Sequence, residues 1–368
     1  MADARVLSVR ELNRATLARQ LLLARHKLAP VAAVERLAGL QAQLARPPYV
    51  GLWSRVAGLT RDKLTRAILA REIVRATLMR ATLHLFSATD YRRLRPCLQP
   101  MLDKGMASIV GKRLAGADVR PVLARARAHL ARPRTLDELR RLLKDDFPGI
   151  DERVMGYAVR CSLGLVHVPD DGHEWGYHGA ARFALADTFL ADPIDGERDP
   201  AELVRRYLAA FGPASVADAQ TWSGLRGLKP TFDALRPELA TFRDARGREL
   251  FDLPRAPRPD ADTPAPVRFL PEYDNLVLGH DDRARMMTDA ARRLIFRNNL
   301  QILPSVLVDG VVAGTWAASA KKGRAVLDVV EFARLPKRAR AELEEEGDAL
   351  LRFVEPEAST RAVTFRDA

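Results

Sequence analysis

The sequence predicts an α+β fold, in which three winged-helix modules in tandem are followed by a β-rich domain at the carboxyl end. Three segments repeat one order of elements, a capped helix and a second helix followed by short apolar strands, which is typical of a winged helix. Residues 261–368 instead alternate apolar runs with turn residues before one helix. With 368 residues, 47% of them hydrophobic, the chain is long enough to bury several cores.

The first module, residues 1–115, opens on Ser8-Val-Arg-Glu11, whose spacing is that of a capping box. We expect a helix from there through residues 21–23, and a second from Pro30 to about residue 40 because proline suits a first helical turn. Thr60 predicts the cap of a third helix over residues 61–70. The β-branched and apolar residues of the 73–86 segment predict the wing strands.

The second module, residues 116–195, has a second capping box in Thr135-Leu-Asp-Glu138. We expect its recognition helix over residues 151–162, then a strand at 164–168 and a turn at Asp170-Asp-Gly172. The third module, residues 196–260, should contain one helix from Pro200, another over 215–225, and a strand pair within 239–253 that turns at 244–247.

The proline-dense segment 255–266 lacks apolar periodicity and predicts a linker. The domain beyond it, residues 261–368, should hold strands at 267–270, 302–308, 311–317 and 325–332, with a helix opening at Pro336. Residues 294–302 predict a hairpin with Asn298-Asn299 at its tip.

Charge favours a polyanionic partner, because 59 Lys and Arg against 47 Asp and Glu give a net charge of +12. An arginine- and alanine-rich composition is also typical of a GC-rich genome, so charge alone does not identify nucleic acid. Cys97 and Cys161 lie far apart and predict no disulfide framework or cysteine metal site. No apolar signal core and no run of about 20 apolar residues is present, so we expect a cytoplasmic, nucleoid-associated protein.

The most informative motif is the segment from Leu40 to Arg55, in which Gln41 and Gln43 flank one alanine ahead of Pro47-Pro48. If this pair is extended, both amides point to one face, because side chains alternate along a strand. The competing interpretation is that the two glutamines only cap the end of a helix.

This motif resembles the Gln-x-Gln motif of the AlkZ-type DNA glycosylases, the helix-turn-helix 42 superfamily of tandem winged-helix proteins. Further segments resemble blocks of the same family in the same order, and they span most of the chain: Arg80-Ala-Thr-Leu-His84-Leu-Phe, Phe211-Gly-Pro-Ala-Ser215, Trp222-Ser-Gly-Leu225, Leu270-Pro-Glu-Tyr-Asp-Asn275-Leu and His280-Asp-Asp-Arg283. The resemblance implies a C-shaped protein that curves around double-stranded DNA, with the glutamines on its concave side and a hairpin of the last domain probing the duplex.

The resemblance also implies that Gln41 and Gln43 are catalytic residues of a glycosylase. Alkylation at a purine ring nitrogen already makes the base a good leaving group, so positioned water and preorganised dipoles suffice for hydrolysis. Two amides without a carboxylate suit cationic lesions such as N7-alkylguanine, whereas some relatives have Gln-x-Asp here. No lysine adjoins the motif, so we expect a monofunctional enzyme without lyase activity. The resemblance implies that the substrates also include bulky adducts and interstrand crosslinks, which the enzyme unhooks, and hence self-resistance to a DNA-alkylating natural product. We expect this hydrolysis to need no metal or cofactor.

Eight further residues are candidates for DNA contacts, mostly because arginine and lysine bind phosphate so often: Arg46, Arg55, Arg80, Arg297, Asn298, Asn299, Lys321 and Lys322. Other interpretations favour structure over function for some neighbours. Tyr49 and Trp53 are expected in a core, and His84 is expected to be structural. The spacing of His173 and His178 does not match a zinc helix.

Three alternatives stay open at this stage. The acidic residues Glu272, Asp274, Asp281 and Asp282 are a rival source of a catalytic carboxylate, although we expect them to cap helices and join modules. A second alternative is a non-catalytic winged-helix regulator, which would prefer one DNA sequence and form a two-fold dimer. A third is a protein that shields lesions without cutting the base. Tandem modules in one chain favour the enzyme and a monomer.

Overall fold

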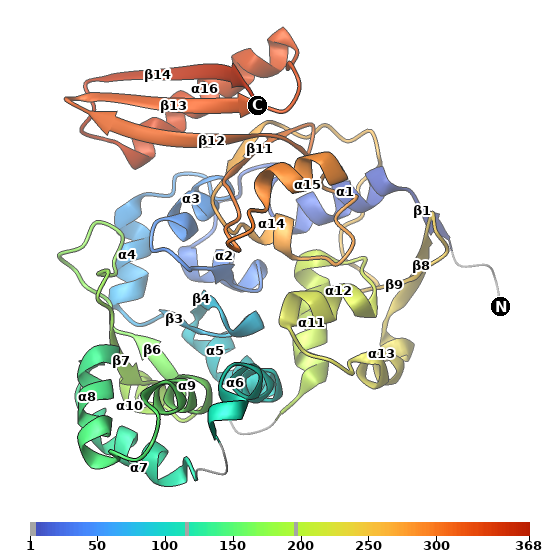
Figure 1. Cartoon of the computed structure of the whole chain (residues 1–368). Helices are drawn as coiled ribbons and strands as arrows, with labels where there is room; N and C mark the ends of the chain where they lie inside the picture. The colour runs from blue at the N-terminus through green and yellow to red at the C-terminus, as the bar shows by residue number, and fades with distance from the viewer. Residues whose placement is uncertain (1–4, 115–117, 195–197) are drawn as a thin grey trace.

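The computed structural model describes residues 5–114, 118–194 and 198–368, and it has the predicted α+β class. Helices and short sheets of the first 260 residues lie below a long-stranded sheet formed by the carboxyl-terminal residues (Figure 1). The predicted module boundaries after residues 115 and 195 lie outside the described residues. The division into three winged-helix modules therefore stays a prediction.

The first region contains the helices that the caps predict, and strands form across the 73–86 segment. Its elements are β1 (Val6–Leu7), α1 (Val9–Arg19), α2 (Pro30–Arg36), β2 (Leu40–Gln41), α3 (Pro47–Trp53), α4 (Arg61–Leu69), β3 (Ile73–Thr77), η1 (Met79–Ala81), β4 (Leu83–Ser87) and α5 (Ala88–Leu94). Ser8 and Glu11 form the capping box, and the Thr60 hydroxyl accepts from the Lys63 amide. Two helices end earlier than expected, and the Pro47-Pro48 segment begins a helix.

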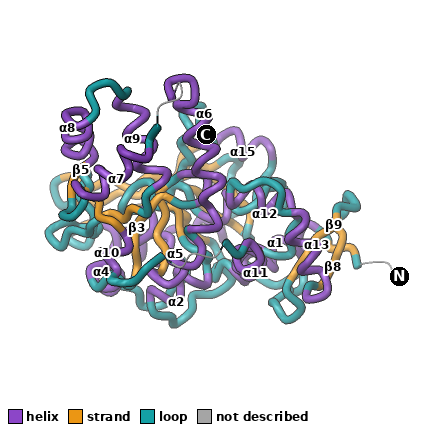
Figure 2. The backbone as a smooth tube through the Cα atoms, turned by 90° about the horizontal axis from the view of Figure 1, so that it is seen from below, coloured by secondary structure: helices purple, strands orange, loops and turns teal. Residues whose placement is uncertain are grey.

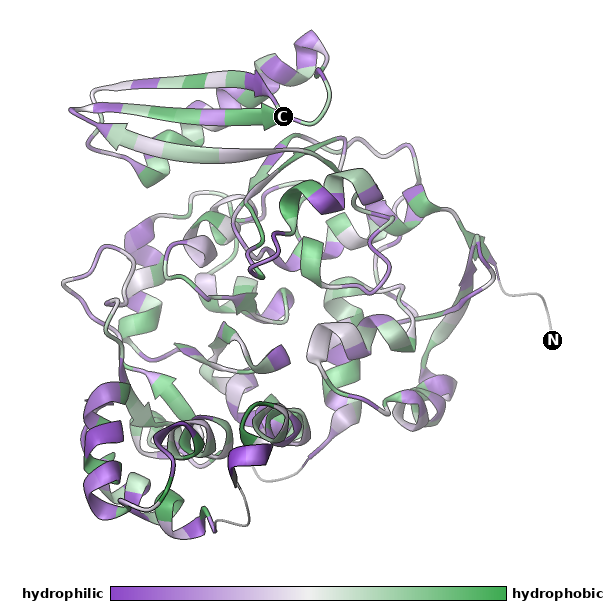
Figure 3. Ribbon diagram, in the orientation of Figure 1, coloured by the Kyte–Doolittle hydropathy of each residue, from purple (hydrophilic) through white to green (hydrophobic). Residues whose placement is uncertain are grey.

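The second region is joined to the first by a shared sheet. It comprises η2 (Pro96–Leu98), α6 (Gln99–Leu114), α7 (Arg120–His129), β5 (Arg134–Thr135), α8 (Leu136–Asp146), α9 (Glu152–Ser162), β6 (Leu165–His167), β7 (Arg182–Leu185) and α10 (Ala186–Leu190). A pairing between Ala76 and Val166 links β3 to β6, which produces one six-stranded sheet in the order β2-β4-β3-β6-β7-β5. Helix α8 buries Leu139 and Leu143, and its outer side is hydrophilic (Figure 3).

The third region takes up the amino-terminal strand. It contains α11 (Pro200–Phe211), α12 (Val216–Ser223), α13 (Lys229–Leu235), η3 (Arg236–Glu238), β8 (Ala240–Asp244) and β9 (Glu249–Asp252). Strand β1 pairs with β8 in parallel, so residues 6 and 7 belong to this sheet although they lie 230 or more residues from it in sequence. Figure 2 shows β8, β9 and α13 at the same end of the molecule as the amino terminus.

The carboxyl-terminal domain has a five-stranded sheet, β10-β11-β12-β13-β14. Its elements are β10 (Arg268–Leu270), α14 (Asn275–Leu278), α15 (Asp289–Ile295), β11 (Ser305–Val308), β12 (Val311–Lys321), β13 (Arg324–Glu331), α16 (Lys337–Val354) and β14 (Thr360–Asp367). Strand β14 was not expected from sequence and pairs with β13 in parallel over eight residues. The predicted hairpin is shorter than expected, because residues 294 and 295 end α15 and only Phe296 and Ile302 pair.

The linker predicted at 255–266 has no helix or strand, and two buried arginines of α1 bind its backbone. Arg14 donates to the Thr263 carbonyl, and Arg19 donates to the Pro257 carbonyl while it pairs with buried Asp252. No helix of the described residues is long and apolar enough to cross a bilayer.

Candidate active site

The glutamine pair lies where α2 ends and the chain enters the six-stranded sheet. Ala38 and Gly39 both have positive φ angles, and a Cβ atom on Gly39 would lie 1.9 Å from a ring carbon of Phe86. Glycine is therefore required at this turn. The turn places Leu40 and Gln41 in β2, where Gln41 pairs with His84 of β4. The predicted position just beyond a helix end is confirmed, and the regular strand ends at Gln41.

Both glutamine amides accept hydrogen bonds from the segment that runs from η1 to the first residue of β4. The Gln41 amide oxygen accepts from Arg80 Nη2 at 2.7 Å, and the Gln43 amide oxygen accepts from the Leu83 backbone amide at 3.4 Å. Gln41 is buried, with 7% of its surface exposed, whereas Gln43 is exposed. The two side chains therefore share one neighbouring segment but differ in their access to solvent.

Arg80 organises the surroundings of Gln41. Its guanidinium also donates to the Trp222 carbonyl and lies 3.4 Å from His84 Nε2. Burial and the nearby Arg283 guanidinium lower the pKa of Arg80 to about 10. The Arg80 backbone has a φ of 54°, and Gly224 packs so closely on it that an added Cβ would lie 3.1 Å from the Arg80 nitrogen. The Arg80 guanidinium is therefore bonded to Gln41 and Trp222, and the expected phosphate contact stays a prediction.

His84 is a structural neighbour of Gln41, as expected. Its Nδ1 atom lies 3.0 Å from the Thr82 carbonyl, which accepts the ring proton, so Nε2 faces Arg80 as an acceptor. Burial and the Arg80 charge lower the pKa of His84 to about 3. A ring that stays neutral at physiological pH cannot act there as a general acid.

A cavity of about 580 Å³ opens beside Gln43, between the first two regions. Arg75 of β3 forms part of its wall and fixes the motif backbone, because its guanidinium donates to the Ala42 and Gln43 carbonyls at 2.9 and 3.0 Å. Tyr177 lies under the Arg75 guanidinium, 5.2 Å from ring centroid to guanidinium carbon. Gln41 does not line this cavity.

The structure corrects the prediction that Arg55 contacts DNA. The Arg55 side chain is 0% exposed and forms a bidentate ion pair with the equally buried Asp274 at 2.7 and 2.9 Å. The Asp274 carboxylate also accepts from the Leu276 amide and caps α14. Tyr49 belongs to a hydrophobic core, and the partly buried Trp53 packs against that core, as expected. Arg55 and Asp274 thus join α3 to the carboxyl-terminal domain.

The other acidic residues are mostly engaged in structure. Asp281 accepts from the Thr221 hydroxyl, and Asp282 pairs with Arg248 at 2.5 Å. Glu272 is half-buried and forms no hydrogen bond or ion pair with the described residues. In the described part of the chain, no carboxylate hydrogen-bonds to either glutamine of the motif.

The remaining DNA-binding candidates lie on different parts of the surface. Arg46 is half-buried over the Trp175 ring, 5.8 Å from its centroid. Arg297, Asn298 and Asn299 are exposed at the hairpin tip, and Lys321 and Lys322 are exposed at the turn between β12 and β13. Among the described residues, no side-chain hydrogen bond joins either turn to Gln41 or Gln43.

Sequence reasoning missed three residues that adjoin these features. Arg283 lies 5.1 Å from the centroid of Phe296, at the base of the hairpin, and its charge acts on Arg80. Leu300 is 86% exposed at the hairpin tip with a φ of 65°. Arg160 of α9 lines the cavity beside Gln43. Each had a signal in the sequence: Arg283 ends one of the family blocks, Arg160 lies in the expected recognition helix, and Leu300 is the apolar residue between Asn299 and Gln301 in the predicted turn.

His173 and His178 lie close together in the segment between β6 and β7. Each accepts a hydrogen bond from a backbone amide two residues ahead, and their rings meet edge to face at 6.0 Å. Across the described ranges, no group of three or more His, Cys, Asp or Glu side chains has the geometry to hold a metal ion.

Two of three comparisons with known proteins give a match, and both matches are described as DNA glycosylases. A family model described as DNA glycosylase AlkZ-like matches residues 34–353, a span that includes Gln41 and Gln43. The solved structure of Streptomyces sahachiroi DNA glycosylase AlkZ is similar with a TM-score of 0.77 and 24% sequence identity, over 99% of this chain and 100% of that chain. The comparison with curated protein sequences gives no match. The structural likeness establishes a shared fold.

Proposed function

Because this chain belongs to the AlkZ-like DNA glycosylase family, we propose that Gln41 and Gln43 carry out hydrolysis of the N-glycosidic bond of cationic alkylated purines, N7-alkylguanine above all. One observation carries the proposal. Two neutral amides accept hydrogen bonds from Arg80 and Leu83, one of them lines a cavity, and no carboxylate among the described residues bonds to them. A centre of this kind suits a base that already carries a positive charge.

The two glutamines have different parts in this proposal. Gln43 is exposed, and its amide oxygen has one long contact of 3.4 Å, so that oxygen is the one free to orient the attacking water. The Gln41 oxygen is occupied by Arg80, whose charge polarises the amide and strengthens its N–H groups as donors. Gln41 therefore presents donors to the substrate, and Gln43 presents an acceptor to water.

The product should be an intact abasic site. An amide is too weakly basic to take the proton from water outright, so the oxocarbenium-like transition state develops first and water adds to it. No lysine in the described part of the chain hydrogen-bonds to either glutamine, and without an amine no Schiff base forms to cleave the strand. We expect strand breaks only after heating or alkaline treatment of the product.

The partner in this proposal is double-stranded DNA, bound by one copy of the protein in the cytoplasm. A net charge of +12 supports attraction to the phosphate backbone. The exposed Arg297, Asn298 and Asn299 support the hairpin as a probe of the duplex, and Lys321 and Lys322 form a second basic turn. Family membership supports bulky adducts and interstrand crosslinks as further substrates, and hence self-resistance to a DNA-alkylating natural product.

The test is base release under single-turnover conditions from duplex DNA that carries N7-methylguanine. The wild-type protein is compared with Gln41→Ala and Gln43→Ala, and duplex affinity is measured for all three. We expect each substitution to lower the rate about 100-fold, the usual effect of removing one preorganised polar group from such a centre, with affinity unchanged. Tight duplex binding without base release by the wild-type protein would refute the proposal in favour of a winged-helix regulator.

A further inference from the structure

The cavity beside Gln43 is larger and less polar than the positioning of one water molecule requires. Its volume of about 580 Å³ lies in the range of small-molecule sites. Buried aromatic residues form much of the wall: His167 stacks edge to face on Phe183 at 4.4 Å and faces Tyr177 at 6.3 Å. Leu44, next to Gln43, lines the same cavity with 52% of its surface exposed. These surfaces suit an aromatic or apolar group.

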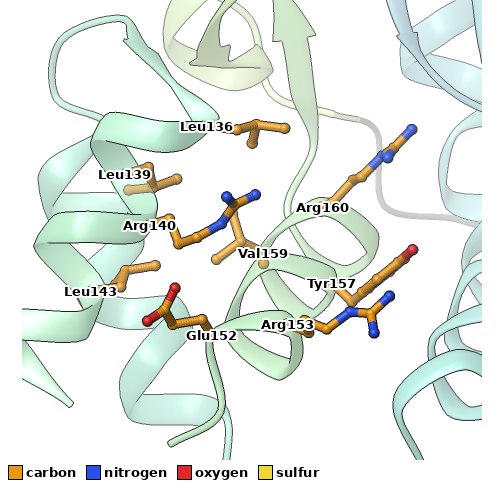
Figure 4. Close-up of a pocket in the computed structure, with 10 residues that line it drawn as sticks. Leu136, Leu139, Arg140, Leu143, Glu152, Arg153, Tyr157, Val159 and Arg160 are labelled. Carbon is orange, nitrogen blue, oxygen red and sulfur yellow. The ribbon is translucent and has the colours of Figure 1, made fainter. Parts of the chain in front are cut away.

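The polar groups of the cavity are mainly positive or neutral. Arg160 forms no hydrogen bond or ion pair with the described residues, and Arg75 uses only Nε and Nη2 toward the motif backbone. Both ring nitrogens of His167, which is 5% exposed, also lack a partner. An adjoining groove of about 420 Å³ lies between α8 and α9 (Figure 4). Leu136, Arg140 and Arg160 line both the groove and the cavity.

This lining disfavours a cationic base as the occupant. A positive N7-alkylguanine ring among the guanidinium groups of Arg75, Arg140 and Arg160 meets like charges, with Asp137 as the only carboxylate among the cavity's lining residues. A neutral group with carbonyl or hydroxyl oxygens instead accepts hydrogen bonds from those guanidinium groups. The lining therefore favours a neutral group attached to the base over the cationic base itself.

We propose that this cavity is the subsite for the substituent of a bulky N7-guanine adduct, and that it takes substituents that are neutral, aromatic and rich in hydrogen-bond acceptors. The inference rests on the proposed function, because Gln43, which lines the cavity, then lies beside the alkylated base while its substituent enters the cavity. The same cavity stays empty during release of N7-methylguanine.

Gly179 offers a way to fill the cavity with little strain. It lines the cavity, an added Cβ would meet no atom within 4 Å, and its φ is not in the left-handed region. Gly179→Trp therefore occupies space that the substituent needs. Gly149, in the turn after α8, is equally open but lines no described cavity, so Gly149→Trp is the matched control. Arg160→Met removes a donor without breaking any described contact.

Single-turnover base release is measured with two duplexes, one carrying N7-methylguanine and one carrying a styrene oxide adduct at guanine N7, which bears a phenyl ring and a hydroxyl. We expect Gly179→Trp to slow release of the styrene oxide adduct at least about tenfold, the usual size of steric selection in a pocket. Arg160→Met should slow it in the same direction. Release of N7-methylguanine should change less than about twofold in both variants and in Gly149→Trp.

Equal slowing on both duplexes, or no change on either, would overturn the subsite. Equilibrium binding of the same duplexes separates this inference from the proposed function. If the wild-type protein releases neither base, the proposed function fails. The subsite then stands only if the protein binds the styrene oxide duplex more tightly than the N7-methylguanine duplex and Gly179→Trp abolishes that preference.

Discussion

Replacing Arg80 with methionine distinguishes two roles for this arginine, which are orienting the Gln41 amide and contacting a DNA phosphate. Methionine keeps most of the side-chain volume but removes the 2.7 Å hydrogen bond to the Gln41 amide oxygen. A hydrogen bond from a charged donor contributes about 1.5–3 kcal/mol. If Arg80 orients Gln41 for the transition state, its loss slows base release by roughly 10- to 150-fold, because each 1.36 kcal/mol is a factor of ten.

The assay is single-turnover release of N7-methylguanine at saturating protein, together with duplex affinity as a function of salt. We expect the rate to fall while affinity and its salt dependence stay unchanged. Arg338→Met is the matched control, because the Arg338 side chain is 91% exposed on α16. A thermal melt of each variant shows whether the Trp222 carbonyl, which also loses its donor, has affected folding.

The opposite pattern would refute this reasoning. If Arg80 contacts phosphate, Arg80→Met leaves the rate at saturation unchanged and lowers the slope of log affinity against log salt by about 0.9. The double variant Arg80→Met/Gln41→Ala gives an independent check. If Arg80 acts through Gln41, the double variant is no slower than Gln41→Ala alone, because the two substitutions remove one interaction.

Further predictions concern stability and the hairpin. Asp274→Asn should lower the free energy of unfolding by about 3–5 kcal/mol in a denaturant titration, because it leaves buried Arg55 without its partner; a smaller loss than about 1 kcal/mol would contradict this. Burial lowers the pKa of His167 to about 3, so below its ordinary pKa of 6.5 the unfolded chain binds a proton that the folded chain does not, and stability falls on acidification. His167→Phe should therefore reduce the stability lost between pH 7 and 5 by about 2 kcal/mol, and an unchanged loss would exclude a neutral buried ring. Arg297→Ala should lower the salt slope of duplex binding by about 0.9, whereas an unchanged slope would remove the hairpin from the interface.

Local chemistry explains what the sequence predicted well. The capping boxes at Ser8 and Thr135 and the caps at Thr60 and Ser215 all begin helices where expected, because a side-chain hydroxyl and a backbone amide three residues ahead decide the start. The turn at Asp309-Gly310 also forms as expected, with both φ angles positive. These features depend on residues that are neighbours in sequence.

Contacts between distant segments explain what the sequence could not predict. Arg55 has a carboxylate partner 219 residues away, and nothing near Arg55 distinguishes a buried ion pair from a phosphate contact. Strand β14 alternates polar residues with Val363 and Phe365, and it is ordered by parallel pairing with β13. The pairing of Ala76 with Val166 that merges two sheets is equally non-local. Patterns of period two or 3.6 carry no information on such partners.

The separate family blocks make physical sense as parts of one centre. Asn275 donates to the carbonyls of Leu37 and Gly39, which fixes the turn that leads into Gln41. From another block, the Trp222 carbonyl accepts from Arg80, and Arg80 in turn donates to Gln41. Asn275 lies 238 residues from Leu37 and Trp222 lies 142 residues from Arg80, so distant blocks restrain the backbone and the side chain of the same glutamine. A glutamine side chain is a weak catalytic group unless its dipole is held in one orientation, and here residues from three regions of the chain supply that restraint.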